Sequence, residues 1–321
     1  MNSNINRFLI LVFTYVLAMV ISPLAIPAYV NITKQAGIDF KHNNGAFGKK
    51  YLPETMGAGS AFIDYNKDGW QDIILVNGKD WPEHPTGSNQ TMALYRNDGN
   101  GNFTDQTQLA KLDIKLYGMG IAVADYDNDG HQDFYLTCLN MDRLFQNQGD
   151  GTFIDVTEKS NISNPYFGTS CAWFDYDKDG YLDLYVANYV EWSIETDLFC
   201  TLEGTSKSYC TPESYQGQPS KLFKNRGNGT FSDVSRIARI ADPTSKSLGV
   251  CTFDYDADGA CDAGDDDDDN DGAADDVDSD DNDENVCSDD DNDTCLDEVD
   301  DAPFEWDGPR IKDYFSKAKA K

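Results

Sequence analysis

Four copies of a nine-residue string rich in carboxylates carry the main chemical signal of this sequence. They read DYNKDGWQD (64–72), DYDNDGHQD (125–133), DYDKDGYLD (175–183) and DYDADGACD (254–262). Each copy has Asp or Asn at positions 1, 3, 5 and 9, and Gly at position 6, where a sharp turn needs it. Hard oxygen ligands at this spacing, with the backbone carbonyl of position 7, are typical of Ca²⁺ sites. The sequence therefore predicts calcium-binding loops.

The predicted ligands of the first three copies can be stated by residue. They are Asp64, Asn66, Asp68, Trp70 and Asp72; Asp125, Asp127, Asp129, His131 and Asp133; and Asp175, Asp177, Asp179, Tyr181 and Asp183, with Trp70, His131 and Tyr181 acting through their backbone carbonyls. Because Asn66 lowers the charge by one, we expect the first loop to bind most weakly. The alternative is that these segments are merely polar turns.

The same spacing continues into an acidic tail. The fourth copy supplies Asp254, Asp256, Asp258 and Asp262, and the tail repeats the pattern at Asp267, Asp269, Asp271 and Asp275, and again at Asp289, Asp291, Asp293 and Asp297, where Thr294 replaces the Gly. The tail has too few apolar residues for a core. We expect calcium to organise it; the alternative is a disordered acidic linker.

The nonapeptide differs from an EF-hand loop in its last ligand and in its flanks. An EF-hand has Glu at position 12, whereas this chain has Leu75, Leu136 or Val186 there. The flanking segments are β-prone rather than helical. The loops are therefore predicted at β-turns, where a bound ion would hold two strands in register.

A second repeated string shows which elements position these loops. LYRNDGNGNFTDQT (94–107), LFQNQGDGTFIDVT (144–157) and LFKNRGNGTFSDVS (222–235) follow the first three nonapeptides. Around the second copy, four short strands are predicted at 120–124, 133–138, 143–146 and 152–157. Four antiparallel strands make one β-propeller blade.

Three complete blades are predicted, near 58–107, 118–157 and 168–235, and a fourth begins at Leu248. The third carries an insertion at about 190–219. The predicted fold is all-β, an incomplete propeller of three to four blades with an Asp-rich tail.

Charge is concentrated in the tail. Of the 57 acidic residues, 25 lie between Asp254 and Asp301, which leaves 32 against 25 Lys and Arg in the rest of the chain. Nucleic acid is therefore excluded as a partner, because phosphate binding needs a basic surface. Cations are the expected partners.

The N-terminus has the pattern of an export signal. Arg7 precedes an apolar run from Phe8 to Ile21, with small residues at Ala25 and Ala28. The run is shorter than the roughly 20 residues that span a bilayer. We expect residues 1–28 to be removed, leaving no stable membrane span and a secreted, periplasmic or cell-surface protein. An uncleaved membrane anchor is the alternative.

Eight cysteines in an exported chain suggest disulfide bonds. Cys200–Cys210 and Cys287–Cys295 would close short loops and are the preferred pairs. Free buried thiols remain the alternative for Cys138, Cys171 and Cys251.

The loops and their following turns resemble FG-GAP/VCBS repeats, the blade units of integrin α-subunit propellers. Residues 36–78 and 209–235 resemble the cartilage acidic protein (ASPIC) family, and residues 254–301 resemble thrombospondin type 3 repeats. The resemblance covers about residues 29–258. It implies an exported, calcium-binding propeller that acts in adhesion or extracellular binding, with the ligands of the first three loops named above.

Together these features predict a signal peptide at 1–28, a propeller-like repeat domain at 29–258, an acidic repeat segment at 259–301 and a C-terminal tail at 302–321. The family has more blades than this chain supplies, and a further C-terminal domain. The chain would be an open arc, a truncated or fused protein, or half of an oligomer.

Three functions are compatible with these features. The first is a non-catalytic module that binds an extracellular protein or glycan, with residues 80–90 and 191–218 as candidate contact loops. Trp81 and His84 would then either face the ligand or pack onto a blade.

The second is a polysaccharide-acting hydrolase or lyase. The sequence has three histidines and no catalytic serine, zinc or phosphate-loop motif, so we expect no enzyme. The third is a spacer whose stiffness depends on calcium.

Overall fold

The computed structural model describes residues 29–87 and 91–252. The chain divides into two compact units, residues 1–39 and residues 40–321. In the described part of the first unit, a turn is closed by the amide of Ala36, which donates to the carbonyl of Ile32 at 2.8 Å. All described strands belong to the second unit.

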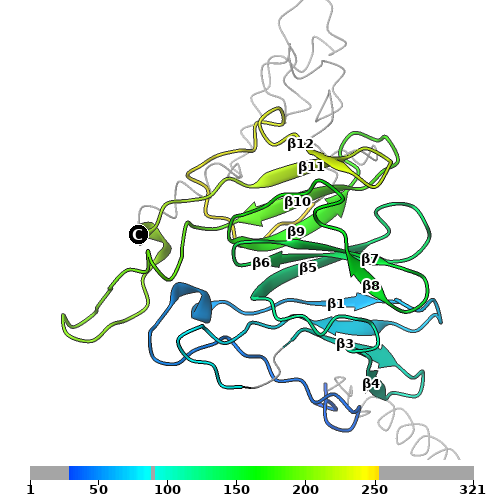
Figure 1. The fold of residues 1–321 in the computed structure, drawn as a ribbon, viewed down its shortest axis with the longest axis horizontal. Helices are drawn as coiled ribbons and strands as arrows, with labels where there is room; N and C mark the ends of the chain where they lie inside the picture. Colours follow the sequence, from blue (N-terminus) through cyan, green and yellow to red (C-terminus); the bar gives the residue numbers. More distant parts are fainter. Residues whose placement is uncertain (1–28, 88–90, 253–321) are drawn as a thin grey trace, which may run out of the picture. The chain divides into compact units, whose positions relative to one another are not determined.

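Three four-stranded antiparallel sheets make up the second unit, and Figure 1 shows their strands. The first sheet has β1 (Ser60–Ile63), β2 (Asp72–Leu75), β3 (Ala93–Asn97) and β4 (Phe103–Asp105); the second has β5 (Gly118–Ala124), β6 (Asp133–Cys138), β7 (Arg143–Asn147) and β8 (Phe153–Asp155); the third has β9 (Gly168–Phe174), β10 (Asp183–Asn188), β11 (Lys221–Asn225) and β12 (Phe231–Asp233). In each sheet, strands adjacent in sequence pair with one another. The predicted four-stranded, all-β units are confirmed for the described residues.

Two short 3₁₀ turns, η1 (Leu52–Thr55) and η2 (Pro212–Ser214), are the only helical segments in residues 29–87 and 91–252. Within the same residues, no helix is both long and apolar enough to cross a membrane.

The register places each nonapeptide between the first two strands of its sheet. Asp72 opposes Ile63, Asp133 opposes Ala124 and Asp183 opposes Phe174 at the start of the second strand. Position 9 of the loop is therefore the first residue of β2, β6 or β10, where the sheet itself fixes its backbone.

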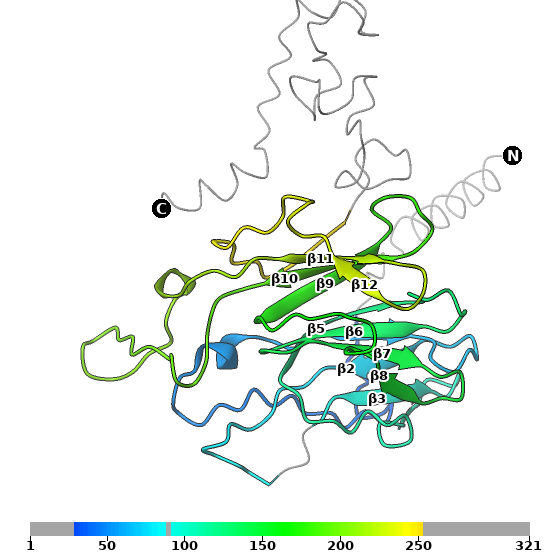
Figure 2. The ribbon, with the colours of Figure 1, turned by 45° about the horizontal axis from the view of Figure 1, so that its top comes forward.

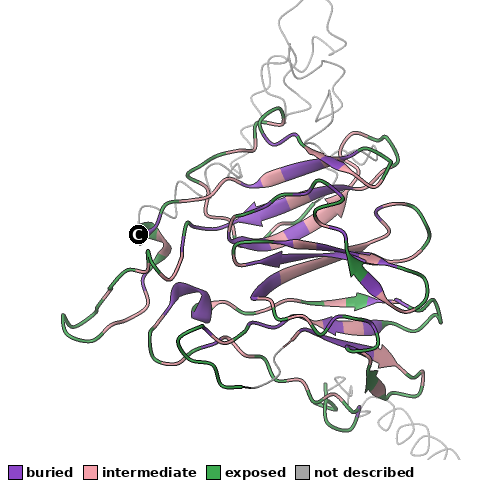
Figure 3. Ribbon diagram, viewed as in Figure 1, coloured by how far each residue is buried: buried purple, intermediate pink, exposed green. Residues whose placement is uncertain are grey.

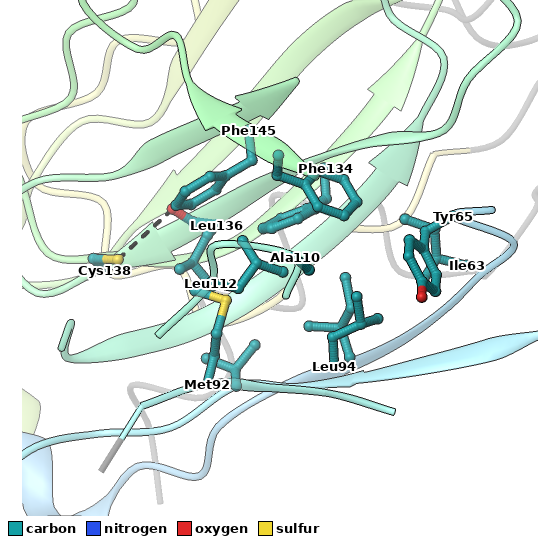
Figure 4. Close-up of a cluster of buried hydrophobic side chains, with 13 residues drawn as sticks. Ile63, Tyr65, Met92, Leu94, Ala110, Leu112, Phe134, Leu136, Cys138 and Phe145 are labelled. Atoms are coloured by element: carbon teal, nitrogen blue, oxygen red, sulfur yellow. Dashed lines mark hydrogen bonds between the residues drawn. The ribbon is translucent and has the colours of Figure 1, made fainter. Parts of the chain in front are cut away.

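The second sheet lies between the first and the third, and a hydrophobic cluster fills each interface (Figures 1 and 2). Figure 4 shows Ile63 and Leu94 of the first sheet near Phe134, Leu136 and Phe145 of the second. The central strands are buried along much of their length (Figure 3). Burial of these side chains, at roughly 1.5–3 kcal/mol each, supplies the main force that joins the sheets.

The inner strands of neighbouring sheets approach closely at their backbones. The amide of Gly59 donates to the carbonyl of Met119 at 2.5 Å. A Cβ atom on Gly120 would lie 2.6 Å from the carbonyl oxygen of Thr169. Glycine at position 120 is therefore required by the packing of β5 against β9.

A third buried cluster is built mainly by connecting loops. It includes Tyr51, Trp81, Tyr117, Trp192 and Tyr215. The insertion of the third sheet enters this cluster through Cys210, which is disulfide-bonded to Cys200. That predicted disulfide is confirmed, whereas Cys138 and Cys171 are free and buried and Cys251 is free and exposed.

The last described residues begin in the same way as β5, the first strand of the second sheet. The amide of Ser247 donates to the carbonyl of Asn188 at 2.9 Å, as the amide of Gly118 donates to that of Asn77 at 3.0 Å. The predicted export signal, the fourth nonapeptide, the acidic segment and the Cys287–Cys295 pair lie outside the described residues.

Candidate metal centre

Three Asp loops, 64–72, 125–133 and 175–183, share one backbone conformation. In the second loop the carboxylate of Asp125 accepts hydrogen bonds from the amides of Asp129 and Gly130, at 3.0 and 2.7 Å. Asp64 and Asp175 accept the equivalent bonds in the other loops. Position 6 is Gly at φ 85° in all three loops, which explains the choice of residue.

The structure brings together the carboxylates at positions 1, 3 and 9 in two of these loops. One carboxylate oxygen from each of Asp125, Asp127 and Asp133 lies within 4.8 Å of the others, and Asp175, Asp177 and Asp183 form an equivalent group. In the first loop Asn66 takes the place of the second acid.

Position 5, which the sequence analysis included among the ligands, lies outside these groups. Asp68, Asp129 and Asp179 are exposed. Each accepts a hydrogen bond from the amide of position 7, at 2.9, 2.7 and 3.0 Å respectively. Their part in ligation, like that of the position 7 carbonyls, stays a prediction.

The position 9 carboxylates are fully buried, and their charge is costly. Burial, aided by the nearby charges of Asp127 and Asp129, raises the pKa of Asp133 to about 8, although the amide of Asn147 stabilises the anion and lowers this pKa. Burial likewise raises the pKa of Asp72 and of Asp183 to about 6. A cation at this place would offset that electrostatic cost.

One buried carboxylate oxygen in each of the second and third loops is left without a hydrogen-bond partner, Oδ2 of Asp133 and Oδ1 of Asp177. Asp133 Oδ1 accepts from the amide of Asn147 at 2.7 Å, but Asp133 Oδ2 is buried and unpartnered. Buried polar atoms without partners are rare and indicate a missing water or ion. Together with the two converging carboxylates, this oxygen gives the second loop the donor set of a hard divalent cation.

The neighbouring strand supplies a different side chain to each loop. Gln146 donates to Asp127 in the second loop at 2.6 Å. In the third loop the ammonium of Lys224 contacts Asp177 and Asp179. Beside the first loop, the equivalent residue Arg96 pairs instead with Asp98 at 2.8 Å. Asn66 of the loop itself donates to Asp68 at 2.8 Å.

Sequence reasoning did not single out three asparagines that end β3, β7 and β11. Asn97, Asn147 and Asn225 donate their backbone amides to the position 9 carboxylates, at 2.7, 2.7 and 2.6 Å. Their signal was present in the second repeated string, in which each of them precedes a turn with two glycines.

The family model of the FG-GAP-like repeat matches residues 64–136 and 125–186. This part of the chain carries FG-GAP-like repeats. Each match begins at an Asp loop and ends in the second strand of the following sheet, so a matched segment contains two successive loops.

Other comparisons give weaker likenesses. No curated protein matches the chain. Among solved structures, an Agrocybe aegerita lectin, described for its specific recognition of non-reducing terminal N-acetylglucosamine, is similar over 63% of this chain, with 17% sequence identity and a TM-score of 0.25. The matched part spans 58% of the lectin chain.

The connecting loops beside the FG-GAP-like repeats hold the aromatic residues that were candidates for ligand contact. Trp81 is buried and stacks with Tyr117 at 4.9 Å between ring centroids. The ring of His84 stacks on Phe47 at 5.0 Å. In the described structure both side chains pack against the protein.

Proposed function

We propose that this protein is a calcium-binding, non-catalytic module for binding or adhesion outside the cell. The FG-GAP-like repeats support an extracellular binding role, and the disulfide Cys200–Cys210 supports an oxidising compartment. The observation that carries the calcium proposal is the unpartnered buried oxygen of Asp133 beside two further carboxylates.

The second loop would hold Ca²⁺ through Asp125, Asp127 and Asp133, and the third through Asp175, Asp177 and Asp183. The first loop would hold it more weakly through Asp64, Asn66 and Asp72, because Asn66 supplies no charge. Bound calcium would supply positive charge where carboxylates converge and would fix the turn between the first two strands of a sheet. Calcium suits this loop better than magnesium, because Mg²⁺ demands stricter octahedral geometry and gives up its waters reluctantly.

The proposal extends to the acidic segment 259–301, whose repeated spacing supplies further calcium ligands. It also includes an extracellular protein or glycan as the binding partner, and export by the N-terminal signal. A screen of the exported chain against polysaccharides tests the non-catalytic part, and turnover that survives removal of calcium would contradict it.

Calorimetric titration of the mature chain with Ca²⁺, followed by melting with and without chelator, tests the calcium proposal. Each site held at ten times its dissociation constant adds about 1.4 kcal/mol. We expect each such site to raise Tm by a few degrees. Asp133→Asn should remove one site from the titration.

Asp150→Asn is the matched control, because it removes the same charge from an exposed turn of the same sheet. It should leave the number of calcium sites unchanged. If the titration shows no heat of calcium binding and the melting curves in calcium and in chelator are identical, the calcium proposal is wrong.

A further inference from the structure

Two asparagine side chains cross the interfaces between sheets and connect one Asp loop to the next. We propose that Asn147 and Asn225 couple the cation affinities of adjacent loops, so that binding in one loop favours binding in its neighbour. The inference rests on the proposed function, and it adds to it a path of communication between sites.

The first link joins loops 64–72 and 125–133. The side-chain amide of Asn147 donates to the carbonyl of Tyr65 at 2.9 Å. Tyr65 lies between positions 1 and 3 of the first loop, so its peptide group sets the direction of both ligands. The backbone amide of Asn147 holds Oδ1 of Asp133 in the second loop. One residue thus positions groups in two loops.

The second link repeats this arrangement one sheet further along. The side chain of Asn225 donates to the carbonyl of Tyr126 at 2.8 Å, and its backbone amide donates to Asp183 at 2.6 Å. Both asparagines are buried, at 1% exposure. Buried hydrogen bonds of this kind are costly to break, so a shift of one partner is transmitted to the other.

Aromatic packing supports the same links. The ring of Tyr65 lies 6.3 Å from that of Phe153 in the second sheet, and Tyr126 lies 5.7 Å from Phe231 in the third. The residue at position 2 of each of these two loops is therefore held by the following sheet through both its carbonyl and its ring.

The first link is reinforced by a residue that the second lacks. Gln132, at position 8 of the second loop, accepts a hydrogen bond from the amide of Asp64 at 2.7 Å. Its own carbonyl accepts from Asn147 at 3.2 Å. The third loop has Leu182 at that position, whose carbonyl also accepts from Asn225, at 3.0 Å, but whose side chain cannot bond to the second loop. We therefore expect stronger coupling between the first and second loops than between the second and third.

The direction of coupling follows from the shared geometry. A cation in the first loop would fix the peptide of Tyr65, and through Asn147 it would also restrain Asp133. Asp133 would then lose less conformational entropy when the second loop binds its cation. A second binding event then costs less ordering, which is positive cooperativity. Coupling free energies between sites usually change affinity five-fold or more.

A matched control exists in the first sheet. Asn97 donates its backbone amide to Asp72 and its side chain to the carbonyl of Gln71, at 3.1 Å, within its own sheet. Asn97→Ala therefore removes the same side chain from an equivalent position without breaking a link between sheets.

The test is calcium titration of the full mature chain followed by NMR. The amides of Gly69, Gly130 and Gly180, which bond the position 1 carboxylates, report one loop each. Disabling the second loop with Asp127→Ala should weaken calcium binding at the first loop by about five-fold or more. In an Asn147→Ala background the same change should leave the first loop unaltered, whereas an Asn97→Ala background should preserve the effect.

Outcomes separate this inference from the proposed function. If no glycine signal responds to calcium, both fall. If the signals respond but Asp127→Ala does not affect the first loop, the coupling is refuted and calcium binding stands. Equal loss of coupling in Asn97→Ala would also refute it.

The second interface provides a test should Asn147→Ala fail to fold. In that case Asn225→Ala is combined with Asp177→Ala, and the Gly130 signal is followed. If Asp177→Ala no longer changes the calcium affinity of the second loop in the Asn225→Ala background, the inference is supported. If Asp177→Ala still weakens that affinity, the inference is wrong.

Discussion

The second and third Asp loops contain the same acids at positions 1, 3, 5 and 9, yet their surroundings differ in charge. Beside the second loop lies Gln146, a neutral donor to Asp127. Beside the third lies Lys224, whose ammonium contacts Asp177 and Asp179. Both residues directly precede the linking asparagine of their strand. One residue of a neighbouring strand therefore decides whether a cluster of carboxylates already has a positive partner.

The position 9 carboxylates show the same contrast. Burial raises the pKa of Asp133 to about 8 but that of Asp183 only to about 6. Oδ2 of Asp183 accepts a hydrogen bond from the amide of Tyr176 at 3.3 Å. In the second loop the equivalent amide of Tyr126 lowers the pKa of Asp133 only as the smallest of its influences, and Oδ2 of Asp133 makes no hydrogen bond of normal geometry. Oδ1 of Asp177 in the third loop is also buried without a hydrogen-bond partner, so each loop has one unsatisfied carboxylate oxygen. Because only the third loop already has an ammonium beside its carboxylates, we expect the second loop to bind calcium most tightly.

The largest expected effect on calcium affinity comes from giving the second loop the lysine that lies beside the third. Gln146→Lys places an ammonium beside Asp127, which calcium must displace, and an ion pair of about 1 kcal/mol lowers affinity by roughly five- to ten-fold. The Gly130 amide signal in a calcium titration measures this affinity. Gln108→Lys, which adds the same charge at an exposed position outside the Asp loops, should change it much less. Equal effects of the two variants would show that only net charge matters.

The reverse change should have a smaller effect. Lys224→Gln removes the competing ammonium from Asp177, and we expect the third loop to bind calcium a few-fold more tightly, followed through the Gly180 signal. The gain is limited because a long lysine side chain moves away at modest cost. Lys221→Gln is the control, since Lys221 lies on the same strand but pairs with Asp233. Unchanged affinity in Lys224→Gln would contradict the comparison.

The first loop offers a third test. Asn66→Asp completes the acidic set of the other two loops, and added ligand charge strengthens calcium sites. The gain should be about two- to three-fold, because Asn66 also donates to Asp68 and that hydrogen bond is lost. Titration followed at Gly69 measures it, with Asn100→Asp in an exposed turn as the charge control. Weaker binding by Asn66→Asp would show that the first loop uses another ligand set.

Much of this architecture follows from local patterns in the sequence. The apolar, β-prone run in residues 133–138 and the glycine turns after β3, β7 and β11 predict the strands and their hairpins, because both are short-range signals. The spacing of the nonapeptide predicts which acids share a loop. The exclusion of position 5 from the acidic groups was not predictable, since it depends on the loop conformation that points Asp129 toward the amide of His131.

Contacts between sheets were beyond sequence reasoning for a physical reason. Asn147 and Tyr65 are 82 residues apart, and no local pattern specifies which carbonyl a buried amide will meet. The same holds for Lys224, which lies 47 positions after Asp177 in the chain. The insertion at about 190–219 lengthens that separation, and the two charges meet only when β11 pairs with β10 in the folded sheet.

The smallest expected effect concerns an ion pair outside the loops. Burial raises the pKa of Asp233, but hydrogen bonds from Lys221 and Ser235 outweigh it and hold this pKa below its ordinary value. A carboxyl with a depressed pKa contributes stability above about pH 4 and loses it as the pH falls through the folded-state pKa. Asp233→Asn should therefore lower Tm by about 1–2 °C at pH 6 and not at pH 2.5. The difference should be the same in calcium and in chelator, because Lys221, unlike Lys224, pairs with an acid that belongs to no Asp loop. A calcium-dependent difference would mean that the two lysines of β11 do not act separately.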